Sequence, residues 1–158
     1  MFKNFFKKEK VRNEDIDNQN ILITALLIHA AKIDENYTNT EKQIIKKAMI
    51  NLGKTTPASV DDLLMKAEKK EQESNQILEF TKEIKKNPME FRLNIIEILW
   101  EIVYSDGTSD SYESNLIRRV CGLLYISDKD NGIIKLKVKN LVNKIWLILL
   151  MTNVLNVN

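Results

Sequence analysis

Two short stretches of the sequence place oxygen-bearing side chains at alternating positions, a pattern typical of loops that bind a hard divalent cation. Alternate residues of a turning chain direct their oxygens to the same side, and Ca²⁺ prefers carboxylate, amide and hydroxyl oxygens. We therefore predict a divalent-cation site, with Ca²⁺ as the candidate ion and no other cofactor. The candidate metal ligands are Asp34, Asn36, Thr38 and Glu41 in the first stretch, and Asp106, Thr108, Asp110 and Glu113 in the second.

Neither stretch is an EF-hand. The EF-hand loop requires Gly at its sixth position and Glu at its twelfth. Counted from each Asp, the sixth residues here are Asn39 and Ser111, and the twelfth are Ile45 and Ile117. A tight Ca²⁺ site takes about six to eight oxygen ligands, more than either stretch supplies. A cation site would therefore need both stretches, or several water molecules.

Helix capping explains most of the same residues without a metal. Thr38 and Glu41 have the spacing of a capping box, in which the hydroxyl and the carboxylate satisfy each other's free backbone amides. Asp110 and Glu113 repeat that spacing. Asp34 has a structural role available as well, because short Asp side chains favour turns by accepting hydrogen bonds from nearby amides. Capping is the alternative to a metal site.

The two stretches belong to an internal repeat. Asp106 follows Asp34 by 72 positions, and each Asp closes an apolar run, residues 21–33 in the first copy and 95–105 in the second. The repeated unit is an apolar helix, an acidic loop and an amphipathic helix. Two copies are too few for a solenoid, so the repeat predicts a pseudo-symmetric pair of helical hairpins packed together.

The elements that position these loops are predicted to be helical throughout. Only four Gly and two Pro occur in 158 residues, which leaves few places for tight hairpins. The apolar run 21–33 has the character of a central helix, because apolar residues occupy most of its sides. Helix start signals occur at Thr38, Ser59, Asn87-Pro88, Asp110 and Ser127. We predict an all-α fold, a compact bundle of seven to eight helices with two pseudo-repeated helical hairpins.

Two of these helices carry more specific expectations. The helix that follows Ser59 alternates Lys with Glu up to Glu73, which is typical of a solvated helix face. Asn87 is expected to be the N-cap of the next long helix, with Pro88 at its first position. That helix is predicted to be the longest and to end near Ser105.

Composition and single residues argue against most enzyme and nucleic-acid functions. Twenty-four basic and 22 acidic residues give a net charge of +2, too even for a nucleic-acid binder. Cys121 has no disulfide partner, which fits the reducing cytoplasm. His29 lacks the partners of a zinc site or a catalytic triad, and we predict a structural role for it and a buried thiol for Cys121. Acid–base chemistry by Asp34 and Asp106 is the remaining catalytic alternative. We predict a protein that is not an enzyme.

The repeated residues carry a family resemblance. They are Ala31-Lys-Ile-Asp34 with Glu41-Lys42, and Tyr104-Ser-Asp106-Gly107 with Asp110 and Glu113. Over roughly residues 18–130 the chain resembles the TerB-like tellurite-resistance family, whose domain also occurs at the front of some DnaJ-type co-chaperones. The resemblance implies a helical cytoplasmic domain without established catalysis, with the acidic loops as a divalent-metal site. It also implies a link to stress responses and to the inner face of the membrane.

The sequence departs from the family pattern at two positions. Glu35 stands where the first loop of the family usually carries Gly, so a left-handed turn there would be strained or absent. Ser114 stands in the second copy at the position that Lys42 occupies in the first. The first loop is therefore the half of the site that fits the family less well.

The two ends lie outside the repeat, which gives a division into a leader (1–17), a TerB-like helical domain (18–140) and an apolar C-terminal segment (141–158). The first ten residues combine four Lys and one Glu with three Phe, a composition that suits an anionic membrane surface. Near the other end, the run Ile145–Met151 is shorter than the roughly 20 residues of a membrane-spanning helix. It is expected to pack on the bundle, with exposure to a partner or a membrane as the alternative.

These observations favour a non-enzymatic TerB-like helical binding module linked to tellurite or stress resistance, which binds a divalent metal through its two acidic loops. The alternative is a structural module that docks a protein partner or the inner membrane surface, with the acidic loops acting only as helix caps. Both interpretations place the chain in the cytoplasm, and the second makes it peripheral to the membrane.

Overall fold

The computed structural model describes residues 2–74, 76–106 and 111–156, and all regular structure within these ranges is helical. Seven α-helices and one short 3₁₀ helix occur there. In chain order they are α1 (Phe2–Ala31), α2 (Asn39–Asn51), α3 (Val60–Glu73), α4 (Ile77–Lys85), α5 (Met89–Val103), η1 (Tyr104–Asp106), α6 (Ser111–Leu123) and α7 (Asp128–Leu155). The predicted fold class and number of helices are confirmed.

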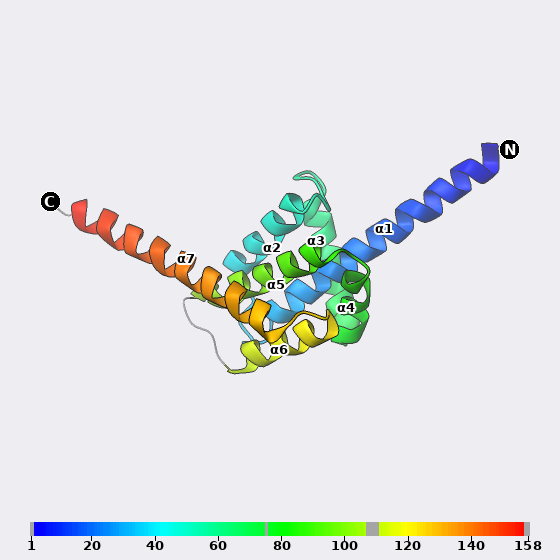
Figure 1. Ribbon diagram of the computed structural model, residues 1–158. Helices are drawn as coiled ribbons and strands as arrows, with labels where there is room; N and C mark the ends of the chain where they lie inside the picture. Colours follow the sequence, from blue (N-terminus) through cyan, green and yellow to red (C-terminus); the bar gives the residue numbers. More distant parts are fainter. Residues whose placement is uncertain (1, 75, 107–110, 157–158) are drawn as a thin grey trace.

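The second half of α1 is the centre of the bundle (Figure 1). It packs against α2, α3, α4 and α5. Leu26, Leu27 and Ile28 are fully buried, because this part of the helix has apolar residues on nearly every side. Burial of one such aliphatic side chain contributes roughly 1.5–3 kcal/mol to folding. The central helix predicted from the apolar run is therefore present.

The amphipathic leader continues this helix. Residues 2–19 are all exposed and extend α1 beyond the bundle as an N-terminal arm (Figure 1). No Gly or Pro interrupts the sequence between this arm and the buried half, so nothing ends the helix between them. Because of this extension, α1 with 30 residues and α7 with 28 exceed α5 with 15. The prediction that α5 is the longest helix is wrong.

The internal repeat is visible in the helix boundaries. The ends of α1 and α5, at Ala31 and Val103, are 72 positions apart, and the starts and the ends of α2 and α6 keep the same spacing. Equivalent residues are buried alike: Ile45 and Ile117 each expose 0% of their surface. The two predicted hairpins therefore form with the register that the sequence repeat indicates.

The repeat extends through the turn that ends each amphipathic helix. Gly53 has φ 69° and Tyr125, 72 positions later, has φ 57°. In each turn the amide after this residue donates back to the helix, from Lys54 to the Met49 carbonyl at 3.0 Å and from Ile126 to the Cys121 carbonyl at 2.9 Å. This is the left-handed helix ending that usually selects Gly. The second copy adopts it with a Tyr.

A third helix packs on each hairpin in an equivalent way. Helix α3 packs against α1 and α2, and α7 packs against α5 and α6. The two halves also contact each other through α1 and α5. The bundle is thus built from two related three-helix arrangements, with α4 between them in sequence.

The start of α5 differs from the prediction. Its N-cap is Pro88, with φ −56°, and the Asn87 side chain faces the preceding helix instead. The Asn87 amide nitrogen Nδ2 donates to the carbonyls of Glu83 at 3.0 Å and Ile84 at 3.2 Å. The junction between α4 and α5 is short, so this amide reaches the free carbonyls at the end of α4. Asn87 therefore caps the C-terminus of α4.

The apolar C-terminal segment does not pack on the bundle, so that prediction is wrong. Helix α7 packs on the core through Val138 and, less completely, Val142. Beyond this point it extends past the bundle as a second arm (Figure 1), and Ile145, Leu150 and Leu155 are 57%, 58% and 78% exposed. The physical reason is that no helix-breaking residue interrupts α7: no Gly or Pro follows Gly132. The helix therefore continues straight, and the chain does not turn back onto the bundle.

By length and composition α7 is also long and apolar enough to cross a membrane, and it is the one such helix in the described ranges. The run Ile145–Met151 is too short for this by itself, as the sequence indicated. It belongs to a helix of 28 residues.

Candidate functional site

The first acidic loop is held by its own short-range hydrogen bonds. Asp34 Oδ1 accepts the Asn36 amide at 2.9 Å. Glu41 Oε2 accepts the Thr38 amide at 2.7 Å, and the Thr38 hydroxyl accepts the Glu41 amide at 3.3 Å. The capping box predicted for α2 is therefore present, with Glu41 buried. The four predicted ligands lie between the end of α1 and the first turn of α2, in a loop that makes these hydrogen bonds within itself.

The left-handed turn in this loop is present despite the missing Gly. Glu35 has φ 61°, and its amide donates to the Lys32 carbonyl at 3.0 Å to close the end of α1. A non-Gly residue in this region carries a cost of about 1 kcal/mol. Of the two outcomes that the sequence left open, strained or absent, the strained turn is the one observed.

The second acidic loop is described only at its borders. Thr108 and Asp110 lie outside the described residues, as does the side chain of Asp106, whose backbone ends η1. Glu113 lies in the first turn of α6 and is buried, as Glu41 is in α2. Within the described ranges, no group of three or more His, Cys, Asp or Glu side chains is arranged to hold a metal.

The flanks of the two loops lie at the same end of the bundle. Helices α1 and α5 pack together, and in Figure 1 both run away from the N-terminal arm towards the end where the loops begin. A groove of about 340 Å³ brings Thr40, next to the first loop, together with Tyr104 and Ser105, which precede the second. Helix α7 also lines this groove, through Val142, Ile145, Trp146 and Leu149. The described residues that flank the two loops thus lie around one region of the surface.

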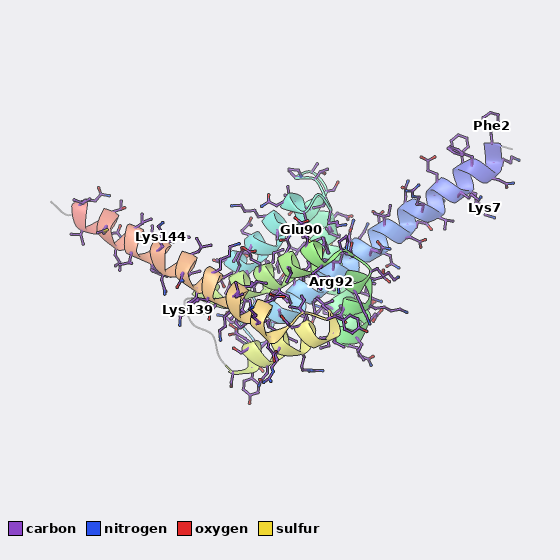
Figure 2. All side chains as sticks on the ribbon, in the orientation of Figure 1. Phe2, Lys7, Glu90, Arg92, Lys139 and Lys144 are labelled. Atoms are coloured by element: carbon purple, nitrogen blue, oxygen red, sulfur yellow. The ribbon has the colours of Figure 1, made fainter. Side chains whose placement is uncertain are left out.

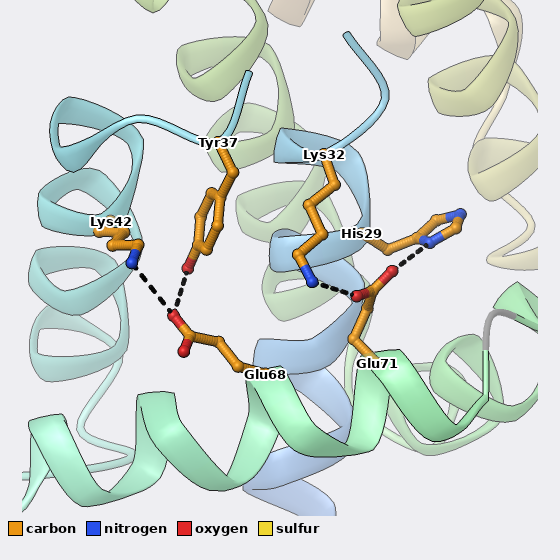
Figure 3. Close-up of polar contacts among 6 residues, drawn as sticks. All are labelled: His29, Lys32, Tyr37, Lys42, Glu68 and Glu71. Atoms are coloured by element: carbon orange, nitrogen blue, oxygen red, sulfur yellow. Dashed lines mark hydrogen bonds and ion pairs between the residues drawn. The ribbon is translucent and has the colours of Figure 1, made fainter. Parts of the chain in front are cut away.

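A buried carboxylate from α3 supports the root of the first loop (Figure 3). Glu71 Oε2 accepts a hydrogen bond from Lys32 Nζ at 2.7 Å, and Glu71 Oε1 lies 3.1 Å from His29 Nδ1. Burial by itself would raise the pKa of Glu71, but the hydrogen bonds from Lys32 and His29 outweigh burial and lower it below the ordinary value. Glu71 is therefore ionised at neutral pH and ties α3 to the end of α1.

A second carboxylate, one turn earlier on α3, holds the middle of the loop. The Tyr37 hydroxyl donates to Glu68 Oε1 at 3.0 Å, and Lys42 Nζ lies 3.7 Å from the same oxygen (Figure 3). Lys42 also sits 4.8 Å from the centre of the Tyr37 ring. Burial and the charge of Glu68 raise the pKa of Tyr37, so its phenol stays protonated and remains a donor. Helix α3 therefore contacts both the end of α1, through Glu71, and the loop itself, through Glu68.

Sequence reasoning missed these supports. The charge alternation of residues 66–73 suggested a solvated face, and this holds for exposed pairs such as Lys69 and Glu73, 3.9 Å apart. It is wrong for Glu71, which is only 8% exposed. A signal was available, because Glu71 continues the helical stripe of Val60, Leu64 and Ala67, all buried. A carboxylate on a buried stripe requires a cationic partner.

The two single residues weighed for catalysis, His29 and Cys121, lie at the edge and in the interior of the bundle. His29 is partly exposed, and among the described residues its side chain makes a polar contact with Glu71. Cys121 is 1% exposed, and burial together with the charge of Asp128 raises the pKa of its thiol to about 12. A thiol with that pKa is a poor nucleophile at neutral pH. The prediction of a buried thiol is confirmed, and the structural role of His29 stays a prediction.

Comparison with known families gives one match. Residues 20–136 match the family model described as tellurite resistance protein TerB. The comparisons with curated proteins and with solved structures give no match. The matched range covers both hairpins, α3, α4 and the start of α7. It leaves out all of the N-terminal arm and the exposed end of α7.

Proposed function

The chain belongs to the TerB family of tellurite resistance proteins, and on this premise we propose that it is a non-enzymatic helical binding module in tellurite or related stress resistance. We further propose that it binds a divalent cation, with Ca²⁺ as the first candidate, between its two acidic loops. The observation that carries this proposal is the shared groove, which brings the flanks of both loops to one end of the bundle.

The geometry of the first loop supports a ligand role. Its hydrogen bonds fix the backbone before any ion binds, which lowers the ordering cost of binding. Asp34 uses Oδ1 in the turn, and its second oxygen makes no hydrogen bond to the described residues. Because one loop supplies too few oxygens for Ca²⁺, the ion would take the rest from Asp106, Thr108, Asp110 and Glu113 or from water.

Calorimetric titration of the chelator-stripped protein with Ca²⁺, Mg²⁺ and Zn²⁺ tests this proposal. We expect saturable binding by the wild-type chain, and its loss in both Asp34→Asn and Asp106→Asn. Glu90→Gln is the matched control, because Glu90 is an exposed carboxylate in the first turn of α5 and lies at the opposite end of that helix from Asp106. Heats no larger than dilution for all three ions would return both loops to helix capping.

A second candidate function rests on a separate observation. The two arms expose large apolar side chains on both sides of the bundle, including Phe2 at 81% and Leu155 at 78%. Exposed apolar surface of this kind marks sites of interaction with proteins or membranes. The chain would then be an interaction module at the cytoplasmic membrane face or on a protein, with the acidic loops serving only as caps. This function needs no cation.

A further inference from the structure

The outer half of α7 is apolar on all sides and exposed on all sides. Residues 145–151 read Ile-Trp-Leu-Ile-Leu-Leu-Met, which is nearly two full helical turns without a polar residue. Trp146 is 53% exposed and Leu149 is 51%, while Leu147 and Met151 on other sides are 60% and 67%. We refer to Ile145–Leu155 as the C-terminal arm.

This arm belongs neither to the core nor to the family match. The match ends at residue 136, and packing of α7 on the bundle ends at Val142. The bundle therefore does not require the apolar side chains beyond that point for its own stability. They need a different explanation from the buried apolar residues of α1 and α5.

The distribution of apolar residues indicates what would cover the arm. A helix that docks in a protein groove presents one apolar face and keeps a polar face in water. The C-terminal arm has no polar face, because its two polar residues, Thr152 and Asn153, are adjacent and point in different directions around the helix. An environment that is apolar on all sides suits it better, and the interior of a lipid bilayer is one.

The charges next to the arm indicate the type of lipid. From Ile133 to the end of the sequence there are four Lys and no Asp or Glu. Lys137 pairs with Glu97 at 2.8 Å and Lys135 lies over the Trp100 ring at 4.9 Å, so both face the bundle. Lys139 and Lys144 are exposed on the stretch of α7 that leads into the arm (Figure 2). Exposed Lys beside an apolar segment favours anionic headgroups.

The length of the arm sets its depth. At a rise of about 1.5 Å per residue, Ile145–Leu155 extends roughly 16 Å, close to half of the ~30 Å hydrocarbon core of a bilayer. Trp146 lies at its base next to Lys144, where an aromatic ring meets the headgroup level. We propose that the C-terminal arm inserts into one leaflet of an anionic phospholipid bilayer, with Lys139 and Lys144 at the headgroups. This inference rests on the second candidate function and identifies its partner as an anionic membrane surface.

Co-flotation with vesicles tests the insertion, using phosphatidylcholine alone and phosphatidylcholine with one-third phosphatidylglycerol. The buffer contains excess chelator, so the result does not depend on the cation site. We expect the full chain to float with the anionic vesicles. Leu147→Glu/Leu150→Glu should lower partitioning by about tenfold or more, since a carboxylate is costly in hydrocarbon. The matched control is Leu78→Glu, because Leu78 is equally exposed at 62% but lies on α4.

Tryptophan fluorescence gives an independent readout of depth. The chain has two Trp: Trp100 is 1% exposed and Trp146 is 53% exposed, so a blue shift on adding vesicles belongs to Trp146. Brominated lipids should quench it, and Trp146→Phe should remove the shift while flotation continues. Lys139→Gln/Lys144→Gln should weaken flotation with anionic vesicles and leave the weak binding to phosphatidylcholine unchanged.

Three results would overturn the inference. The first is that the full chain does not float with either type of vesicle. The second is that the Leu147→Glu/Leu150→Glu variant floats as well as the wild type. The third is that the wild type self-associates in solution and the same double variant does not. The last result would show that the arm packs against a second copy of the chain. Both substituted side chains are exposed, at 60% and 58%, so the variants should fold, and far-ultraviolet circular dichroism checks this.

Discussion

The two copies of the repeat share helix boundaries that lie 72 positions apart, but they differ in the third helix that covers them. In the first copy α3 ends after 14 residues, and its buried Glu71 forms charged contacts with His29 and Lys32 of α1. In the second copy α7 continues for 28 residues. Its polar contacts with α5 are a neutral hydrogen bond, from the Trp100 ring nitrogen to Asn131 Oδ1 at 2.9 Å, and a half-exposed ion pair between Lys137 and Glu97 at 2.8 Å.

This difference shows where the repeat is conserved in structure and where it has diverged. The hairpin is a common scaffold, because its burial pattern and its left-handed helix ending are the same in both copies. The third helix supports the acidic loop in one copy and forms an exposed arm in the other. The proposed functions follow the same division, with the loops at the shared scaffold and the membrane contact on the diverged helix.

The largest expected effect tests whether the two hairpins support the core equally. Ile45→Ala and Ile117→Ala each remove a fully buried side chain at equivalent positions. Each should lower the free energy of unfolding by about 2–4 kcal/mol, since truncation of a core Ile leaves a cavity. Denaturant unfolding measures both. Ile133→Ala, at a 57% exposed position of α7, should change it by less than about 0.5 kcal/mol.

An unequal result would break the comparison. If one Ile variant loses less than about 1 kcal/mol while the other loses the full amount, the two hairpins do not contribute equally to one cooperative core. The sequence repeat would then reflect shared ancestry of the backbone without shared energetics.

The next effect tests the charged support of the first copy. Glu71→Gln removes the charge that Lys32 and His29 contact and should lower the free energy of unfolding at pH 7 by roughly 1–3 kcal/mol. Because the pKa of Glu71 is lowered in the folded state, its stabilisation is fully present above the unfolded value of 4.5 and is lost as the pH falls through the folded value. The difference between wild type and variant should therefore close below about pH 4.5.

Unfolding curves measured at several pH values check this prediction. Glu73→Gln is the matched control on the same helix, because the Lys69–Glu73 pair is exposed and 3.9 Å apart, and such pairs contribute about 0–1 kcal/mol. A constant difference between wild type and Glu71→Gln from pH 7 to pH 3 would show that packing, and not the charge, accounts for the loss.

Much of the fold could be predicted from the sequence because its signals are local. The Thr38–Glu41 capping box, the Ser127 cap of α7 and the 72-residue offset depend on residues close together in the chain or on a direct internal match. Capping in the first loop was therefore foreseen in detail. Whether the capped loops also bind a metal stays a prediction, since no metal-binding group occurs among the described residues.

The features that could not be predicted depend on contacts between distant elements. Glu71 lies among alternating Lys and Glu residues at 66–73, a pattern that suggested a solvated face. Its partners, however, lie 39 and 42 positions earlier on α1. Apolar composition alone could not show whether residues 145–155 are covered. That depends on where the bundle ends along α7, and Val142 is the last residue of α7 that packs on it. Local patterns do not carry this information.

The smallest effect compares the left-handed positions. Gly53→Ala should lower the free energy of unfolding by about 1 kcal/mol. No atom lies within 4 Å of a Cβ built at Gly53, so the cost comes from the backbone alone. Glu35→Gly should raise the free energy of unfolding by about 0.5 kcal/mol. Glu35 is exposed and has φ 61°, so the substitution relieves backbone strain. The gain is small because Gly also has more conformational freedom in the unfolded chain. Opposite signs in denaturant unfolding would show that each left-handed turn of the first hairpin carries a cost set by the residue that occupies it. A loss in Glu35→Gly would mean that the Glu35 side chain stabilises the first loop by contacts that outweigh its strained backbone.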